Sequence, residues 1–224
     1  KTPVASIQGY LETILDNPNI NDQMREQFLG RCYAQSQRLT SLLHDISTLN
    51  RMDDAPEMTS TENVNISQMV QNIQKETALQ LQQKHMTFNN RLPDNIVVRG
   101  NQSLLYSVFR NLTDNAIAYA GEGTTITLTA QRPDTDMVES DISDKGGSAK
   151  WTFTFADNGV GVPAEHLPRL FERFYRVDKG RSRKMGGTGL GLAIVKNAVL
   201  LHGGTIRVSQ NEGGGLKFVF SLKI

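Results

Sequence analysis

Four short segments in the second half of the chain carry amide, carboxylate and glycine patterns that suit a phosphorylated ligand. The first is the run 111–116, Asn-Leu-Thr-Asp-Asn-Ala, in which Asn111 and Asn115 are four residues apart and share one face of a helix. Neutral amide oxygens suit a hard cation that already carries phosphate charge. On its own, an asparagine pair is more often a surface or capping feature.

The second segment, 157–161, follows a hydrophobic strand pattern and reads Asp-Asn-Gly-Val-Gly. Gly159 and Gly161 permit a tight turn and a close approach of the backbone to a ligand. The carboxylate of Asp157, at the end of the strand, is suited to accept a hydrogen bond from an exocyclic amine. Taken alone, this pattern also fits an ordinary turn.

The third segment, 170–176, is the aromatic and basic run Leu-Phe-Glu-Arg-Phe-Tyr-Arg. Its structural interpretation is a small helix that docks Phe171 and Phe174 on the core. Residues 176–185 contain five basic residues and one acidic residue, which indicates a mobile cationic flap. A solvated loop is the alternative for that stretch.

The fourth segment, 186–192, is Gly-Gly-Thr-Gly-Leu-Gly-Leu and opens into a helical pattern. A glycine cluster before a helix leaves N–H groups free at the positive end of the helix dipole, where polyphosphate binds. The sequence contains neither a P-loop pattern nor a Rossmann βαβ unit around these glycines, so neither of those nucleotide sites is predicted.

The elements that must position these segments form an α+β arrangement with a mixed or antiparallel sheet. Helical periodicity covers 66–83, 102–119 and 190–201, and strand patterns cover 86–90, 96–99, 124–130, 151–156, 205–208 and 217–222. Residues 131–150, rich in Asp, Ser and Gly, predict a long hairpin connection between two strands. A glycine turn at 213–215 joins the last two strands.

The first fifty residues predict two antiparallel helices. An apolar stripe runs through 4–14, a turn follows at 16–19, and Asn21 or Asp22 caps the second helix. The second stripe comprises Phe28, Cys32, Gln35, Leu39, Leu42, Ile46 and Leu49, with the alternating steps of a coiled-coil seam. Because a lone hairpin leaves this seam in water, we predict a four-helix bundle with a second copy. Packing on the chain's own remainder is the alternative.

The composition excludes several classes of protein. The 224 residues include 24 Lys and Arg against 23 Asp and Glu, and a net charge of +1 excludes a strongly basic nucleic-acid binder. The single cysteine, Cys32, excludes an internal disulfide framework and a Cys-rich zinc cluster. No apolar run approaches the roughly 20 residues that span a bilayer. The start at Lys1 without Met predicts a longer protein, so membrane attachment is expected only through upstream segments.

Together and in this order, the four segments resemble the N, first glycine, F and second glycine boxes of bacterial sensor histidine kinases, within the GHKL ATPase superfamily. Residues 1–53 resemble the family's dimerisation and phosphotransfer hairpin, so the similarity spans essentially the whole chain. The resemblance implies domain boundaries of 1–53 for the hairpin, 54–62 for a linker and 63–224 for a GHKL-type α/β sandwich that binds ATP.

The family's hairpin pattern is His-Glu/Asp-Leu-Lys-Thr-Pro, and this chain begins with Lys-Thr-Pro. The resemblance therefore implies a phosphoacceptor histidine three residues before Lys1, outside this sequence. The four histidines of the chain are expected to be surface or packing residues: His44, His85, His166 and His202.

The resemblance also implies roles for individual residues. Asn115 would bind Mg²⁺, Asn111 would support the nucleotide one turn earlier, and Asp157 would bind adenine. Gly159 and Gly161 would shape the base pocket. The remaining implied nucleotide contacts are Tyr119 beside the nucleotide, Gly187, Thr188, Gly189, Leu190 and Gly191 near the phosphates, and Arg176, Arg181 and Arg183 as balancing charges.

The implied activity is transfer of the ATP γ-phosphate to a histidine and then to an aspartate of a response-regulator receiver domain. The implied setting is a homodimer, formed through residues 1–53, in the cytoplasmic portion of a bacterial inner-membrane sensor. Asn111 stands where GHKL enzymes that activate water carry a glutamate base, which favours histidine phosphorylation over ATP hydrolysis. Thr2 matches a hairpin threonine that orients water in a phosphatase reaction; its alternative role is structural, beside Pro3.

One residue departs from the family pattern. Ala118 stands where Lys or Arg is common and can reach phosphate. Its presence supports an alternative function, a nucleotide-binding signalling module with weak or no kinase activity. A third class, a GHKL ATPase of the chaperone or topoisomerase type, is disfavoured by the heptad hairpin and by Asn111.

Overall fold

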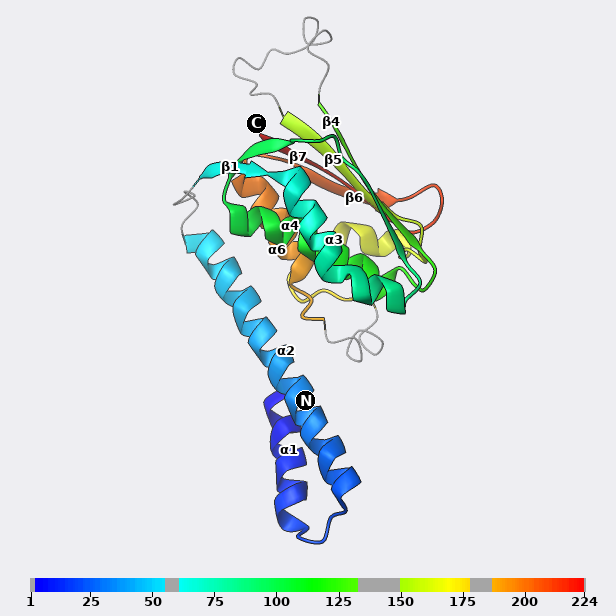
Figure 1. The fold of residues 1–224 in the computed structure, drawn as a ribbon. Coiled ribbons are helices and arrows are strands. Elements are labelled where there is room, and N and C mark those ends of the chain that lie inside the picture. The colour runs from blue at the N-terminus through cyan, green and yellow to red at the C-terminus, as the bar shows by residue number, and fades with distance from the viewer. Residues whose placement is uncertain (1–2, 55–60, 133–149, 178–186, 224) are drawn as a thin grey trace, which may run out of the picture.

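The structure is a computed structural model that describes residues 3–54, 61–132, 150–177 and 187–223 (Figure 1). A long helical hairpin extends away from an α+β body. The predicted fold class, an N-terminal helical hairpin followed by an α+β domain, is confirmed. The domain boundaries stay a prediction, and residues 55–60 of the expected linker lie outside the described residues.

The hairpin consists of α1 (Pro3–Asp16) and α2 (Asp22–Asp54). Asn21 caps α2, because its side-chain oxygen accepts the backbone N–H of Met24 at 2.7 Å. The helices pack along the predicted seam, where Tyr10 stacks on Phe28 with ring centroids 5.6 Å apart. At the C-terminal end of α2, the apolar seam packs on the α+β body instead of on α1. Leu49 is 2% exposed there and belongs to the core of that body.

The main sheet has the strand order β2-β4-β5-β7-β6. Its strands are β2 (Thr87–Arg91), β4 (Thr125–Gln131), β5 (Lys150–Asp157), β6 (Ile206–Gln210) and β7 (Leu216–Lys223). Strands β2 and β4 pair in parallel and the other neighbours pair antiparallel, so the sheet is mixed, the first of the two predicted alternatives. Strands β4 and β5 form the expected hairpin, although residues 133–149 of its connection lie outside the described residues.

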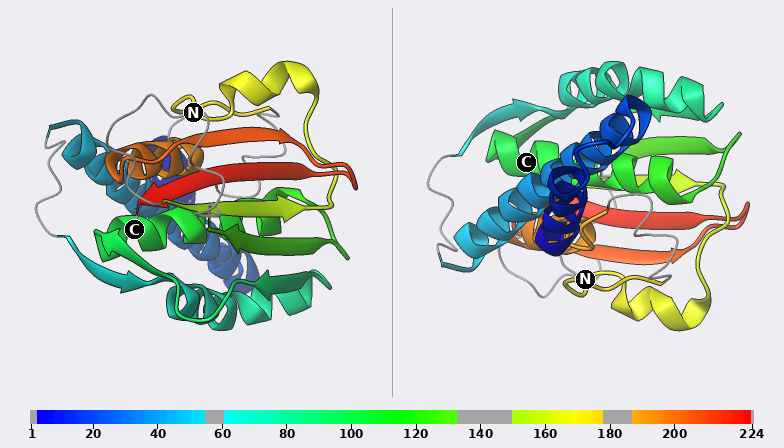
Figure 2. Two further views of the ribbon diagram at one scale, coloured as in Figure 1. Left: turned by 90° about the horizontal axis from the view of Figure 1, so that it is seen from above. Right: turned by 90° about the horizontal axis from the view of Figure 1, so that it is seen from below.

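Three helices cover one face of this sheet: α3 (Ile66–Gln83), α4 (Gln102–Tyr119) and α6 (Gly191–Leu201) (Figures 1 and 2). Alternate residues of β7 are buried, as expected when one face of a sheet packs on helices. Phe109 of α4 meets Phe153 and Phe220 of the sheet edge to face, with ring centroids 5.5 and 5.6 Å apart. This aromatic cluster holds α4 against the sheet.

A short strand pair differs from the sequence prediction. Strand β1 (Glu62–Asn65) pairs antiparallel with β3 (Val97–Gly100) in a separate two-stranded sheet. The sequence shows no strand pattern at β1, because Val64 is its single apolar residue.

The prediction of a small helix at 170–176 is wrong. A short 3-10 helix, η2 (Ala164–Arg169), precedes the run, and the run itself forms turns. Phe171 packs edge to face on Phe218, as expected of a residue that docks on the core. Phe174 is instead 60% exposed and has a φ of +63°, a left-handed conformation that a helix does not accommodate.

Candidate nucleotide-binding site

Helix α4 positions the asparagine pair at the edge of the core. The helix begins at a cap in which the Asn101 side chain accepts the backbone N–H of Leu104 at 3.0 Å. Leu112 is fully buried, which fixes the rotation of the helix about its axis. Asn111 and Asn115 are consequently half-buried along the boundary between core and solvent.

Asn111 lies against the first residue of α6. Its Nδ2 donates to the carbonyl oxygen of Ser107 at 2.8 Å, so its Oδ1 is the free end of the amide. A Cβ added at Gly191 would lie 2.7 Å from that oxygen, so a larger residue would displace the Asn111 amide where α6 approaches α4. Asn115, one turn later, makes no side-chain hydrogen bond within the described part of the chain.

Asp157 is a buried carboxylate held by backbone donors. It ends β5 with 5% of its surface exposed. One carboxylate oxygen accepts the N–H of Gly159 at 3.0 Å, and the other accepts the N–H of Leu216 at 3.3 Å. Burial raises the pKa of Asp157, and these two hydrogen bonds partly oppose the rise. Each oxygen retains one further acceptor direction.

Close backbone packing fixes the loop that follows Asp157. A Cβ on Gly159 would lie 2.2 Å from the carbonyl oxygen of Ala120, the residue that ends α4. That same oxygen accepts the N–H of Val160 at 3.0 Å. Gly161 has a φ of +62°, which favours glycine. The loop and the end of α4 therefore form one rigid corner.

The glycine segment 187–191 also packs against α4. A Cβ on Gly187 would lie 2.8 Å from the Tyr119 hydroxyl and 3.4 Å from the Arg176 guanidinium. The carbonyl oxygen of Gly189 accepts the backbone N–H of Phe174 at 2.9 Å, which joins the third and fourth sequence segments. Leu190 is fully buried and anchors the segment where α6 begins.

The contacts along α4 bring most of the predicted residues to one side of this helix. Asn111 touches Gly191, Tyr119 touches Gly187, and the adjoining Ala120 touches Gly159 beside Asp157. The glycine segment thus follows the second half of α4, and the buried carboxylate lies beside the end of this helix. Thr2, Arg181, Arg183 and Gly186 lie outside the described residues, so the structure does not place them.

The turn 213–215 contributes to the site in a way that the sequence analysis missed. A Cβ on Gly215, whose φ is +81°, would lie 2.2 Å from a carboxylate oxygen of Asp157. Asn211, just before the turn, donates from its side chain to the main-chain oxygen of Asp157 at 3.0 Å. The signal was present as three consecutive glycines, but a hairpin turn explains such a run equally well.

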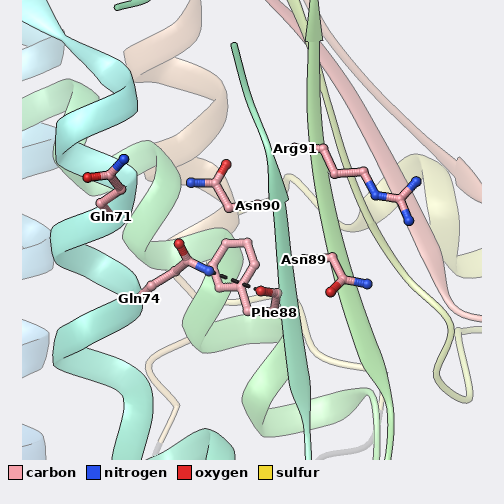
Figure 3. A pocket seen from close by; sticks show the side chains of 6 residues that line it. All are labelled: Gln71, Gln74, Phe88, Asn89, Asn90 and Arg91. Atoms are coloured by element: carbon pink, nitrogen blue, oxygen red, sulfur yellow. Dashed lines mark hydrogen bonds between the residues drawn. The ribbon is translucent and has the colours of Figure 1, made fainter. Parts of the chain in front are cut away.

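An open pocket elsewhere on the body contains none of the predicted residues (Figure 3). It has a volume of about 490 Å³ and lies between α3 and β2, where Gln74 donates to the carbonyl oxygen of Phe88 at 3.0 Å. Its lining consists of Gln71, Gln74, Phe88, Asn89, Asn90 and Arg91. Arg91 is the one charged side chain of this lining, and it points away from α3 (Figure 3).

Comparison with known proteins identifies the family of this arrangement. Residues 100–224 match the histidine kinase-, DNA gyrase B- and HSP90-like ATPases. The chain belongs to this ATPase family. Residues 1–55 match the phospho-acceptor domain of histidine kinases, so the chain carries the domain pair of a histidine kinase core.

Curated relatives match almost the whole chain. The sensor-like histidine kinase SenX3 of Mycolicibacterium smegmatis is 31% identical over 222 residues, which are 99% of this chain and 54% of the relative. The phosphate regulon sensor protein PhoR of Haemophilus influenzae is 33% identical over 221 residues, which are 98% of this chain and 48% of the relative. The chain therefore spans about half the length of these relatives.

Solved structures share the fold of this histidine kinase core. The Acinetobacter baumannii histidine kinase AdeS superposes with a TM-score of 0.71 at 23% identity, covering 99% of this chain and 95% of that one. Family membership also makes residues 100–224 an ATP-binding domain. Within the described residues, no helix combines the length and apolar character needed to cross a membrane.

Proposed function

We propose that this chain is the catalytic core of a sensor histidine kinase. It binds ATP, transfers the γ-phosphate to a histidine just upstream of Lys1, and then passes it to an aspartate of a response-regulator receiver domain. The observation that carries the proposal is the junction of Asn111 with Gly191. There a neutral amide, rather than a carboxylate base, lies beside the start of α6.

Asp157 is the residue proposed to recognise adenine. Both of its oxygens are oriented by backbone N–H groups, and each retains a lone pair that an exocyclic amine can use. A buried acceptor of this kind discriminates strongly, because a base without the amine would leave the carboxylate unpaired. Gly159 and Gly161 let the loop after Asp157 pack closely on the backbones of Ala120 and Gly215, which fixes the proposed base pocket.

The phosphates are proposed to lie along the glycine segment 187–191. Backbone N–H groups at the start of α6 and the Arg176 guanidinium beside Gly187 provide positive charge there. Thr188 and Leu190 belong to the same segment, and Tyr119 flanks it. Arg181 and Arg183 are expected to add charge from the preceding flap, 176–185. Transfer of a phosphoryl group depends mainly on such positioning and charge neutralisation.

A magnesium ion fits the donor set of α4. The side chain of Asn115 is half-buried and has no hydrogen-bond partner within the described residues, so its oxygen is available as a hard ligand. When bound, Mg²⁺ would offset the negative charge of the phosphates. Asn111 supports the same site from one turn earlier.

The proposed partners follow from the domain pair. The hairpin forms a homodimer, and its phosphohistidine serves a cognate receiver domain. Thr2 is proposed to add a phosphatase activity toward that receiver domain. A cytoplasmic location is proposed, with membrane attachment through segments upstream of Lys1. The alternative function, supported by Ala118, is a nucleotide-binding signalling module with weak or no kinase activity.

The test uses the chain extended upstream to include the expected histidine. Incubation with γ-labelled ATP and Mg²⁺ is expected to give an acid-labile, base-stable label that disappears when this histidine is changed to Gln. Asn115→Ala should abolish the label, while Asn72→Ala, an exposed asparagine on α3, should not change it. Nucleotide binding without any label would favour the alternative, and rapid ATP hydrolysis by water would favour the third class.

A further inference from the structure

The main sheet has one face that no described helix covers, opposite α3, α4 and α6 (Figure 1). Side chains alternate between the two faces along a strand, and the buried Phe218 and Phe220 of β7 mark the helix side. The strand register then assigns every strand residue to one face or the other. Five residues of the open face are cationic, and we call them the basic sheet face: Arg91, Lys150, Arg207, Lys217 and Lys223.

The basic sheet face contains no balancing acid. No Asp or Glu stands among the residues that the five described strands place on this side. None of the five cations forms an ion pair within the described part of the chain. Because the whole chain has 24 Lys and Arg against 23 Asp and Glu, this face is a local concentration of charge and not a result of overall composition.

Some of these cations lie close enough to repel each other. Lys150 of β5 pairs directly with Lys223 of β7, and like charges at opposed positions destabilise a sheet. Arg207 of β6 pairs with Val219, which places it diagonally beside Lys217 of the same strand β7. An anionic partner on this face would relieve the repulsion.

The charges spread over the sheet in two dimensions. Lys217 pairs with Ala156, six residues from Lys150, so the two lysines are about 20 Å apart along the strands at ~3.3 Å per residue. Arg91 and Arg207 belong to the two edge strands and lie about 19 Å apart, across four strand spacings of ~4.8 Å. A linear acidic segment can contact one row of such an array, whereas a planar anionic surface contacts all of it.

The open face also lacks the apolar centre of a protein interface. Ala156 and Val219 are its apolar residues in the described strands, and its other uncharged side chains are hydroxyls and amides. Protein interfaces use apolar and aromatic anchors and exclude most charge from their centre. Lipid headgroups are instead bound by additive electrostatic contacts, which this face provides.

We propose that the basic sheet face docks on a bilayer surface that carries anionic lipid. The choice of a lipid surface rests on the membrane attachment proposed above, because a tether upstream raises the effective concentration of the ATP-binding domain at the bilayer. The proposed nucleotide site lies on the helix side of the sheet, so docking leaves it open. The attraction is electrostatic and weakens as the ionic strength rises.

Vesicle cosedimentation tests the proposal. The full chain is mixed with vesicles of phosphatidylglycerol and phosphatidylethanolamine, or of phosphatidylcholine alone, at low and high salt. Binding is expected to the anionic vesicles alone and should fall with salt. Arg207→Gln should weaken it about fivefold, the contribution of one cation near an anionic membrane. Lys75→Gln, which removes an exposed cation of α3, should bind like the parent. Absent binding, or equal effects of the two substitutions, overturns the proposal.

The opposed lysines give a test that a folding defect cannot imitate. Lys150→Gln removes the repulsion from Lys223, so it should raise the free energy of unfolding in urea while it weakens binding to the anionic vesicles. Weaker binding by a variant at least as stable as the parent supports docking through this face. Unchanged binding to the vesicles overturns it.

Other anions are outcomes of the same assay. Residues 133–149, outside the described residues, contain one lysine and five acids: Asp134, Asp136, Glu139, Asp141 and Asp144. Vesicle binding that appears only after these acids are changed to Ser would make that segment the occupant and overturn the lipid proposal. Tighter binding to polyglutamate or to duplex DNA than to vesicles, at equal anion concentration, would also overturn it.

Calorimetric titration with a non-hydrolysable ATP analogue and Mg²⁺ separates this proposal from the proposed function. A chain that binds the analogue and ignores anionic vesicles overturns the docking surface and leaves the proposed function intact. A chain that binds the vesicles but no nucleotide overturns the proposed function and leaves the docking surface.

Discussion

At the scale of single residues, the site depends on a buried carboxylate and on glycines that nothing larger can replace. We expect Asp157→Asn to weaken binding of Mg-ATP by about tenfold or more, the effect of losing a charged hydrogen-bond partner. The new amide also turns a donor toward the N–H of Gly159 or Leu216. Calorimetric titration measures the loss. Asp94→Ala, an exposed acid outside the site, serves as control, and unchanged affinity in a folded Asp157→Asn variant would contradict the assignment.

Substitution of two glycines by alanine distinguishes a site where glycine is required for steric reasons from one where it only adds backbone flexibility. Gly159→Ala would place a methyl group 2.2 Å from the Ala120 carbonyl oxygen, so we expect lower stability and loss of nucleotide binding. Gly30→Ala, in the middle of α2 with nothing within 4 Å, should instead raise the free energy of unfolding by about 1 kcal/mol. Thermal and urea unfolding of both variants measures the contrast. Similar effects of the two substitutions would contradict it.

At the scale of elements, a buried histidine joins α6 to the start of α4. In the neutral ring of His202, Nδ1 donates to the Ala198 carbonyl at 2.7 Å and Nε2 accepts the Asn101 N–H at 3.1 Å. Burial lowers the pKa of His202 below its usual value of 6.5. The unfolded chain therefore takes up this proton first as the pH falls. The contribution of the neutral ring to stability is complete above about pH 6.5 and declines below it.

Urea unfolding between pH 5 and 8 should therefore show a dependence on pH that His202→Gln reduces. The difference in slope between parent and variant should be about 0.7 kcal/mol per pH unit near pH 6.5, where half of the unfolded histidine is protonated. It should rise toward about 1.4 kcal/mol per pH unit, the value for one proton, at lower pH while the folded ring stays neutral. His85→Asn removes an exposed histidine whose φ of +52° an asparagine also tolerates. This control should keep the slope of the parent, and an unchanged slope in His202→Gln would refute the role of the buried ring.

The sequence predicted elements better than it predicted the contacts between them. Helical periodicity predicted α4 and α6, and the four ordered segments pointed to the ATP-binding fold. The position of Gly215 against Asp157 could not be predicted from the sequence, because pairing of β5 with β7, and not a local pattern, brings these residues together. The hydrogen bond between Thr188 and Asp45 could not be predicted either, because these residues are 143 positions apart.

At the scale of the whole molecule, the two ends of α2 have different surroundings. Its last turns pack on the ATP-binding domain, while the lower hairpin leaves large apolar side chains in solvent. Leu15 of α1 is 76% exposed, and Leu29 and Leu43 of α2 are 48% and 61% exposed. Two helices alone cannot cover such surfaces, and a four-helix bundle of two copies would bury them.

We therefore expect the chain to sediment as a dimer of its 24.9 kDa subunit. Leu15→Glu combined with Leu29→Glu should produce monomers, because charges buried at a bundle interface are costly. Leu79→Glu changes a leucine of α3 that is 64% exposed and should leave the dimer intact. A chain that remains monomeric at all concentrations would mean that the hairpin relies on its own remainder.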